Sequence, residues 1–392
     1  MLMKQIRTVH DLAVRGAVPA FNEPLHVGRP NLATRDDFMR LTQEIYERRW
    51  LTNNGPLVQE FESAVCRRLG VRHCVAMCNG TVALEIAIRA LGLTGEVILP
   101  SWTFVASAHA LHWQALTPVF ADIDPSTHNI DPDAVRRLIT PRTSGILGVH
   151  LWGRPAPVDD LQSIADEFGL QLLFDAAHAF DCSLGARTVG TFGRCEVLSF
   201  HATKVLNSME GGAVVTQDSE LADAMRLMRN FGFRGYDDVA YPGTNGKMVE
   251  VCAAMGLVNL ASLDEFVTCN RQNYEAYSDA FSNLSGASVL KFSPADRSNF
   301  HYVVVELDDE FAHKRDEIVS ALHAENVLAR RYFWPGCHKM SPYRELQPSA
   351  SLWLERTEAV SRKVVVLPTG PSVSLSDIEI ISDVVRVVLT ES

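Results

Sequence analysis

Residues 197–216 read VLSFHATKVLNSMEGGAVVT, and this stretch says more about the expected fold than any other. An apolar run typical of a buried strand leads to Ser199, Lys204 follows, and the glycine pair at 211–212 precedes a second β-rich run. Burial disfavours a charged amine, so a lysine this close to buried strands is expected to have a lowered pKa. Such an amine is suited to Schiff-base formation with an aldehyde. The plainer explanation, a solvated lysine in a loop, also fits this stretch taken alone.

Short β-rich runs alternate with helical patterns from about residue 34 onward. The runs are EVILP, TPVFAD, GILGVHL, LQLLFD, EVLSF and GAVVT. This alternation predicts βαβ units, and therefore an α/β fold with a mostly parallel sheet between layers of helices. After about residue 265 the rhythm changes to HYVVVEL, a helix near 309–326, VVVLPTG and a closing helix. We therefore expect an N-terminal arm (1–33), a large domain (34–265) and a smaller α+β domain (266–392).

The run LQLLFDAAHAF delivers Asp175 at the exit of a buried strand, and His178 lies close to one helical turn further on. A carboxylate in that position is costly unless a cation pairs with it. A protonated pyridine nitrogen is a suitable cation, and an aspartate beside it keeps the ring protonated. His178 could orient such a ring. An aspartate that merely caps a helix explains the motif equally well when it stands alone.

The turn CNGT (78–81) lies between a short strand and a helical pattern. Gly80 lets the backbone approach a ligand closely, and a helix N-terminus offers unpaired N–H groups to an anion. These groups, with the Thr81 hydroxyl, could hold a phosphate. Helix capping is the alternative. In an open α/β sheet, ligands bind beyond the carboxyl ends of the strands, which is where all three motifs fall.

Composition narrows the classes of function. The chain of 392 residues has a net charge of -11 and no basic stripe, which argues against nucleic-acid binding. No apolar run approaches the ~20 residues that span a bilayer, and the N-terminus lacks a signal-peptide core. The eight scattered cysteines have no metal-site spacing, so we predict reduced thiols, no metal and a cytoplasmic location.

Together the glycine-containing phosphate turn, DAAHAF and SFHATK…EGGAVVT resemble the DegT/StrS family of sugar aminotransferases. The resemblance extends from LTNNGPLVQEFE to the PTG segment near residue 370. It implies an aspartate aminotransferase-like architecture, fold type I of the enzymes that use pyridoxal 5′-phosphate (PLP), which becomes pyridoxamine 5′-phosphate in the half-reaction. It also implies a homodimer with shared active sites.

The resemblance assigns roles to individual residues. Lys204 becomes the lysine that binds PLP covalently and shuttles the proton, Asp175 the partner of the ring nitrogen, and His178 a neighbour of the ring. The remaining matches are to phosphate contacts (Gly80, Thr81, Ser199), a stacking aromatic (Phe104), a phosphate contact from the second subunit (Asn245) and the sugar-nucleotide site (His338, with Tyr332 and Trp334 as weaker candidates).

The form SFHATK…NSMEGG looks like members that aminate C4 of a 4-keto-6-deoxyhexose, and members that act at C3 often carry a tyrosine in place of His201. We therefore expect transfer from L-glutamate to C4 of a nucleotide-linked, dTDP-type substrate, as in synthases of 4-amino-4,6-dideoxyglucose. Amination at C3 is the alternative. Sugar dehydration is disfavoured because relatives that dehydrate commonly carry histidine in place of Lys204. A PLP-binding regulatory protein is a remote alternative, since no DNA-binding helix-turn-helix or basic face is visible.

Overall fold

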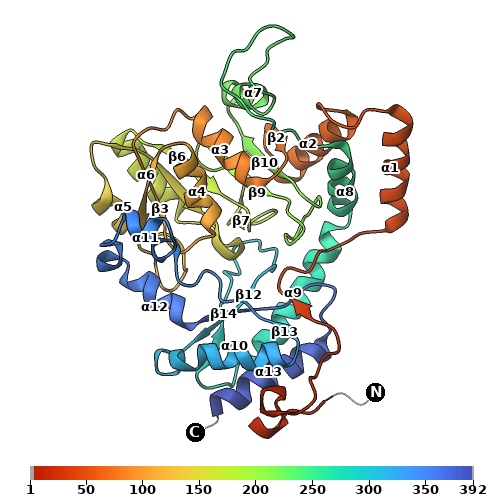
Figure 1. Cartoon of the computed structure of the whole chain (residues 1–392), viewed down its shortest axis with the longest axis vertical. Coiled ribbons are helices and arrows are strands. Elements are labelled where there is room, and N and C mark those ends of the chain that lie inside the picture. The colour runs from red at the N-terminus through yellow and green to blue at the C-terminus, as the bar shows by residue number, and fades with distance from the viewer. Residues whose placement is uncertain (1–3, 391–392) are drawn as a thin grey trace.

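The computed structural model describes residues 4–390, and a seven-stranded sheet forms its centre (Figure 1). Across the sheet the strands are β2 (His73–Met77), β10 (Gly212–Thr216), β9 (Cys195–Ser199), β6 (Gln171–Asp175), β5 (Thr143–Val149), β3 (Glu96–Pro100) and β4 (Thr117–Ala121). Only β10 runs antiparallel to its neighbours in this sheet, and the other adjacent pairs are parallel. The predicted α/β fold with a mostly parallel sheet is confirmed.

Helices cover both faces of this sheet. On one face lie α3 (Gly80–Ala90), α4 (Val105–Trp113) and α7 (Ser219–Met228). On the other lie α2 (Pro56–Leu69), α5 (Pro132–Leu138), α6 (Val158–Phe168) and α8 (Glu250–Ala261), with α1 (Arg35–Arg48) outside α8. Along β2, Cys74 and Ala76 point into the hydrophobic core on the α2, α5, α6 and α8 face. Val75 and Met77 point into the core on the α3, α4 and α7 face. This two-residue alternation is why central strands read as continuous apolar runs.

Asn79 decides where α3 begins. Its backbone is extended, and its side-chain oxygen accepts a hydrogen bond from the Val82 backbone N–H at 2.8 Å. The sequence predicts a turn at residues 78–81 and a helix that begins after Thr81, whereas the observed helix begins at Gly80 because Asn79 acts as its N-cap. The earlier start places the first turn of α3 beside the end of β9.

A second, antiparallel sheet lies below the first and consists of β11 (Ala287–Val289), β12 (Val303–Leu307) and β14 (Val364–Leu367). It packs with α9 (Leu263–Phe281), α10 (Arg315–Ala324) and α13 (Leu375–Thr390). The helix predicted at 309–326 is divided into η4 (Asp309–Lys314) and α10. The shorter elements are β7 (Ser183–Leu184), β8 (Arg187–Thr188), α11 (Tyr343–Leu346), α12 (Glu355–Lys363), η1 (Val9–Asp11), η2 (Ala13–Arg15), η3 (Leu151–Gly153), η5 (Cys337–Lys339) and η6 (Ala350–Trp353).

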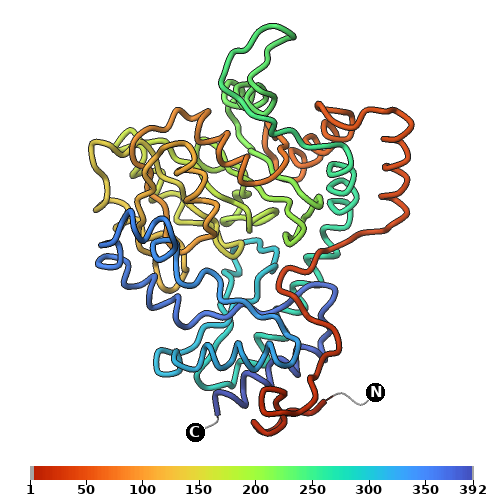
Figure 2. Tube along the Cα trace, in the orientation of Figure 1, coloured from red at the N-terminus to blue at the C-terminus, as the bar shows by residue number. Residues whose placement is uncertain are grey.

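The N-terminal segment packs against this lower part, where both ends of the described chain lie (Figure 2). Strand β1 (Leu25–His26) pairs in parallel with β13 (Val327–Leu328). The buried Glu325 carboxylate accepts hydrogen bonds from the backbone N–H groups of Ala13 and Ala20, both at 2.6 Å. The predicted boundary at 265/266 falls in the first turns of α9, and the three-part domain division stays a prediction.

Within residues 4–390, no single helix has the length and apolar character needed to cross a bilayer; α8 and α9 reach them only when counted together across a 60° bend. The same residues contain no group of three or more His, Cys, Asp or Glu side chains arranged to hold a metal ion. All eight cysteines are free thiols.

Candidate active site

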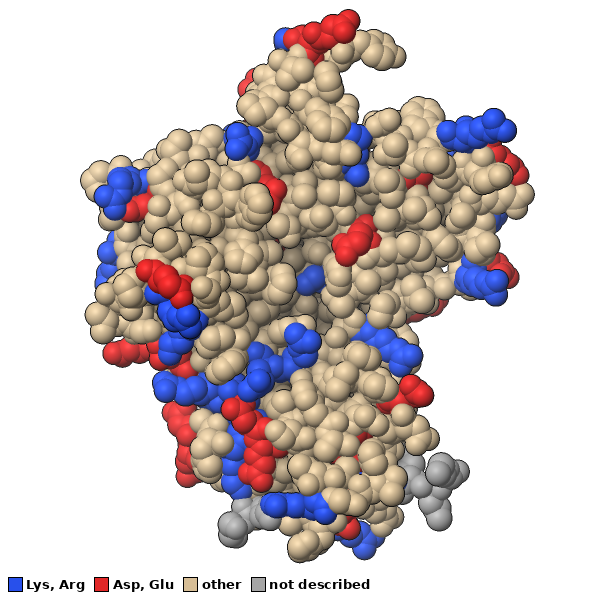
Figure 3. All heavy atoms as spheres, in the orientation of Figure 1, with Lys and Arg blue, Asp and Glu red and all other residues tan. Residues whose placement is uncertain are grey.

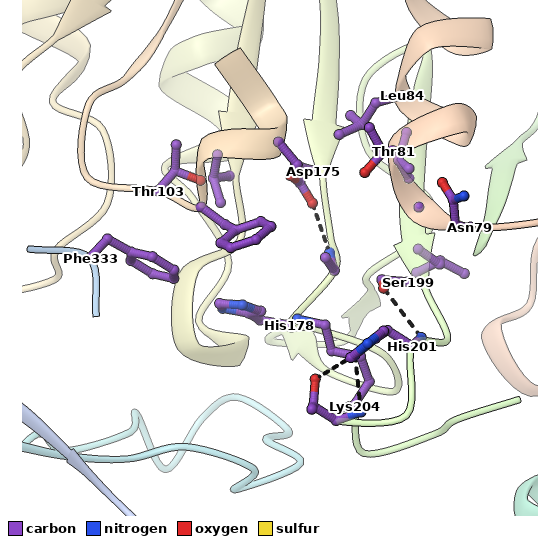
Figure 4. Close-up of a pocket in the computed structure, with 18 of the residues that line it drawn as sticks. Asn79, Thr81, Leu84, Thr103, Asp175, His178, Ser199, His201, Lys204 and Phe333 are labelled. Carbon is purple, nitrogen blue, oxygen red and sulfur yellow. Dashed lines mark hydrogen bonds between the residues drawn. The ribbon is translucent and has the colours of Figure 1, made fainter. Parts of the chain in front are cut away.

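A cavity of about 300 Å³ lies where β2, β6 and β9 reach their carboxyl ends, and it opens into the hollow near the middle of the face shown in Figure 3. Segments from both sheets surround it. The lining includes Asn79, Gly80, Thr81, Thr103, Phe104, Asp175, His178, Ser199, His201, Thr203, Lys204, Glu210, Tyr302, Tyr332 and Phe333. Figure 4 shows Asp175, His178 and Lys204 around the same space. The structure thus brings together the three motifs that the sequence analysis singled out.

Lys204 lies in the connection between β9 and β10, where its backbone N–H donates to the His201 carbonyl at 2.9 Å. Its Nζ donates to the Tyr302 hydroxyl oxygen at 3.3 Å. The side chain is half-buried, and its exposed part faces the cavity. This burial lowers the pKa of the amine to about 8, and the Asp175 carboxylate partly opposes that shift. The amine is therefore a better nucleophile at neutral pH than an ordinary lysine.

Asp175 is the last residue of β6, and only 6% of it is exposed. Its Oδ2 accepts a hydrogen bond from the Ser107 hydroxyl at 2.8 Å, and its Oδ1 accepts one from the Ala177 N–H at 3.0 Å. No lysine, arginine or histidine within residues 4–390 forms an ion pair with this carboxylate. A buried carboxylate without such a partner is costly, which leaves a place for a cationic group of a ligand.

His178 lies in an aromatic cluster and is held as a neutral ring. Its ring centroid is 4.3 Å from that of Tyr302 and 5.9 Å from that of Phe333. Its Nδ1 accepts a long hydrogen bond, 3.4 Å, from the Trp152 backbone N–H, which assigns the ring hydrogen to Nε2. Burial, followed by the Lys204 charge, holds the pKa of His178 well below its usual range. His178 therefore offers the cavity a neutral N–H donor.

Gly80 and Gly212 let α3 approach the ends of β9 and β10. A Cβ added at Gly80 would lie 3.2 Å from the Ser199 Cβ, and one at Gly212 would lie 2.5 Å from the Gly80 nitrogen. The first N–H groups of a helix have no partners within the helix and favour an anion. With the hydroxyls of Thr81 and Ser199 in the same lining, this wall of the cavity suits a phosphate.

The other predicted site residues divide into two groups. Phe104, 56% exposed, and Tyr332 line the cavity. His338 does not: it is 2% exposed, and its Nδ1 lies 2.7 Å from the Ser101 hydroxyl. Asn245 is exposed and forms a β-bridge with Asn230 at the base of the loop that projects beyond α7 (Figure 1), and it does not line this chain's own cavity. Trp334 is also outside the lining.

Two side chains that hydrogen-bond to Lys204 or Asp175 were not predicted from the sequence. Tyr302, just before β12, contacts both Lys204 and His178, and burial raises the pKa of its hydroxyl. Ser107, in the first turn of α4, holds the Asp175 carboxylate. Ser107 lies three residues after Phe104, which the family resemblance assigns to the site, so its proximity in sequence was the available signal. Tyr302 gives no signal beyond its place at the start of an apolar run.

The fold and the cavity together define a class. The mostly parallel sheet has a half-buried lysine, an aspartate without a cationic partner and a helix N-terminus beyond the carboxyl ends of its strands. This is the arrangement of a fold-type-I PLP enzyme. The residues fit that cofactor. A protonated ring nitrogen would supply the cation that Asp175 lacks, Lys204 would supply the amine, and the N-terminus of α3 with Ser199 would hold the phosphate.

Residues 33–386 match the DegT/DnrJ/EryC1/StrS aminotransferase family, and the chain belongs to this family. It is 36% identical over 348 residues to dTDP-4-amino-4,6-dideoxy-D-glucose transaminase of Escherichia coli, covering 88% of this chain and 94% of that protein. It is 34% identical over 342 residues to GDP-perosamine synthase of Caulobacter vibrioides, covering 86% and 91%. It also resembles the crystal structure of DesI in the presence of its TDP-sugar product, with a TM-score of 0.94, 47% identity and coverage of 98% and 97%. The family resemblance read from the sequence is confirmed.

Proposed function

We propose that this chain is a PLP-dependent aminotransferase that moves the amino group of L-glutamate to C4 of a dTDP-linked 4-keto-6-deoxyhexose, in deoxyaminosugar biosynthesis. The observation that carries the proposal is that one cavity is lined by both Lys204, whose amine has a lowered pKa, and Asp175, whose carboxylate has no ion-pair partner within residues 4–390. The names of the relatives support the choice of a dTDP-linked sugar as the substrate. The E. coli protein is named for dTDP-4-amino-4,6-dideoxy-D-glucose, and the crystal structure of DesI was analysed in the presence of its TDP-sugar product.

Each wall of the cavity has a part in holding the cofactor. Lys204 would bind it through Nζ, Asp175 would pair with the ring nitrogen, and Gly80, Thr81 and Ser199 would hold the phosphate. Bound PLP supplies an aldehyde for amines and a protonated ring that withdraws electrons from the reacting carbon. Phe104 lines the same cavity and offers an aromatic face for the ring.

The chain itself supplies proton transfer and positioning. The Nζ of Lys204 would remove a proton from one carbon and deliver it to a second carbon. Only a neutral amine can accept that proton. With a pKa of about 8, roughly one free amine in ten is neutral at pH 7. Tyr302 accepts a hydrogen bond from Nζ and so directs the amine. Ser107 keeps the Asp175 carboxylate oriented, and His178 remains a neutral donor.

We infer that two copies of the chain form a homodimer. The loop from about residue 229 to 249 projects from the body in Figures 1 and 2. Its exposed aromatic residues are Phe231 (46%), Phe233 (39%), Tyr236 (100%) and Tyr241 (38%). Exposed apolar groups gathered on one loop favour burial against a partner. Asn245 lies on the same loop and would reach the partner's phosphate site. Light scattering should give twice the chain mass, and Tyr236→Asp should shift the population toward monomer.

Absorbance tests the aminotransferase assignment. The protein reconstituted with PLP should be yellow and should lose its visible band when glutamate is added. Lys204→Ala should show no such glutamate response, whereas the control Lys291→Ala, which changes an exposed lysine, should behave as wild type. A wild-type protein that neither binds PLP nor responds to glutamate would overturn the proposal. The cytoplasmic location stays a prediction.

A further inference from the structure

Arg330 combines a fixed backbone with a side chain that stacks on Tyr332 and forms no ion pair or side-chain hydrogen bond within residues 4–390. Its N–H donates to the Val366 carbonyl at 3.0 Å, and its own carbonyl accepts from the Val366 N–H at 2.8 Å. This pair ties Arg330 to β14, two residues before Tyr332, which lines the cavity together with Phe333. The position of Arg330 relative to the cavity mouth is therefore set by the sheet, while its guanidinium remains available.

The guanidinium of Arg330 lies over the ring of Tyr332, with its Cζ 5.0 Å from the ring centroid. Stacking occupies the face of a guanidinium and leaves its N–H donors free at the edge. Within residues 4–390 these donors have no ion pair and no hydrogen bond. The neighbouring Arg331 differs, because it pairs with Asp316 at 2.9 Å and stacks on Trp334.

An anionic substrate would need a positively charged side chain, apart from the reacting lysine, near the cavity. Among the described residues no arginine lines it, and its lysine, Lys204, is committed to the reacting centre. The chain as a whole has a charge of -11, yet Figure 3 shows Lys and Arg side chains gathered just below the hollow. An anionic substrate would be attracted to such a local positive region on an acidic protein.

We propose that Arg330 binds the diphosphate of the nucleotide sugar at the mouth of the cavity, through paired N–H donors, while its face stays on Tyr332. The proposal rests on the proposed function. C4 of the sugar must reach Lys204, and the diphosphate is attached to C1 on the opposite side of the hexose, so it lies further out. Arg330 stacks on Tyr332, which lines the cavity, so its guanidinium lies one ring further out. This matches the outer position expected for the diphosphate. The α-carboxylate of glutamate, in contrast, must lie beside the reacting carbon.

Calorimetric binding of dTDP to the PLP-loaded protein tests this proposal, with thymidine as the probe that lacks phosphate. Arg330→Gln should weaken dTDP binding by about 10- to 100-fold, the effect of losing charge-assisted hydrogen bonds, and leave thymidine binding within about twofold of wild type. Arg330→Lys should give an intermediate loss, because the charge stays and the planar fork does not. The matched control Arg331→Gln should change dTDP affinity by less than about twofold, because Asp316 and Trp334 already engage that side chain. Equal dTDP affinity in wild type and Arg330→Gln, or an equal loss in Arg331→Gln, would overturn the proposal.

The glutamate half-reaction separates this proposal from the aminotransferase assignment. It involves no diphosphate, so its rate in Arg330→Gln should match that of wild type. A half-reaction slowed as much as dTDP binding is weakened would assign Arg330 to the donor carboxylate instead and overturn the diphosphate role. A wild type that responds to glutamate but does not bind dTDP would overturn the inference and the dTDP part of the proposed function, and would leave the aminotransferase assignment standing. A wild type that binds dTDP through Arg330 but ignores glutamate would overturn only the aminotransferase assignment.

Discussion

Raising the pH should speed the capture of PLP by Lys204 in a range well below that of an ordinary lysine. The unprotonated amine is the nucleophile, and burial lowers the pKa of this amine from 10.5 to about 8. At pH 7 about 9% of the amine is neutral with a pKa of 8, against about 0.03% with a pKa of 10.5, a difference of about 300-fold. The capture rate should therefore rise about tenfold for each pH unit below 8 and level off near pH 9.

Stopped-flow absorbance after mixing PLP with protein stripped of cofactor measures this rate. Lys204→Ala gives the background of binding without the lysine. Asp175→Asn provides a second check on the sign, because the Asp175 charge raises the pKa of Lys204. Removing that charge should move the plateau to lower pH. A wild-type rate that is still climbing tenfold per pH unit above pH 10 would refute the claim that burial tunes this amine.

Three substitutions test other parts of the site. Asp175→Asn should reduce aminotransferase turnover on the order of 100-fold, because the carboxylate no longer stabilises a protonated ring, and a steady-state assay with saturating PLP measures the loss; near-normal turnover would contradict the role. Ser107→Ala should lower the free energy of unfolding of the cofactor-free protein by about 1–3 kcal/mol in urea, since a buried carboxylate loses a donor, and an unchanged midpoint would argue against it. Gly212→Ala should cost about 1–3 kcal/mol, because its Cβ would meet the backbone of Asn79 and Gly80 at 2.5 Å. The control Gly235→Ala, with nothing within 4 Å, should change stability by less than about 0.5 kcal/mol, and equal effects of the two substitutions would contradict the close approach.

The convergence of Asp175 and Lys204 could be predicted because it depends on local signals. Each follows an apolar run, and β6 and β9 are adjacent parallel strands whose carboxyl ends meet at one edge of the sheet. The phosphate wall follows from the same rule, since β2 ends at that edge and leads into α3. Only the start of α3 differed, because the choice of N-cap depends on a single hydrogen bond by Asn79.

Contacts between distant parts of the chain could not be predicted in this way. Tyr302 reaches Lys204 from 98 residues further on, and that contact depends on how the small sheet packs below the large one. Nothing in the sequence around His338 indicates that its ring hydrogen-bonds with Ser101 and does not line the cavity. The role of Asn245 depends on a second copy of the chain, so it stays a prediction.

The structure of the product tests the central claim most directly. The PLP-loaded protein is incubated with glutamate and dTDP-4-keto-6-deoxyglucose, and the sugar nucleotide formed is analysed by NMR. The account predicts an amino group at C4, in the equatorial position. A product aminated at C3, or no aminated product despite a normal glutamate half-reaction, would contradict it.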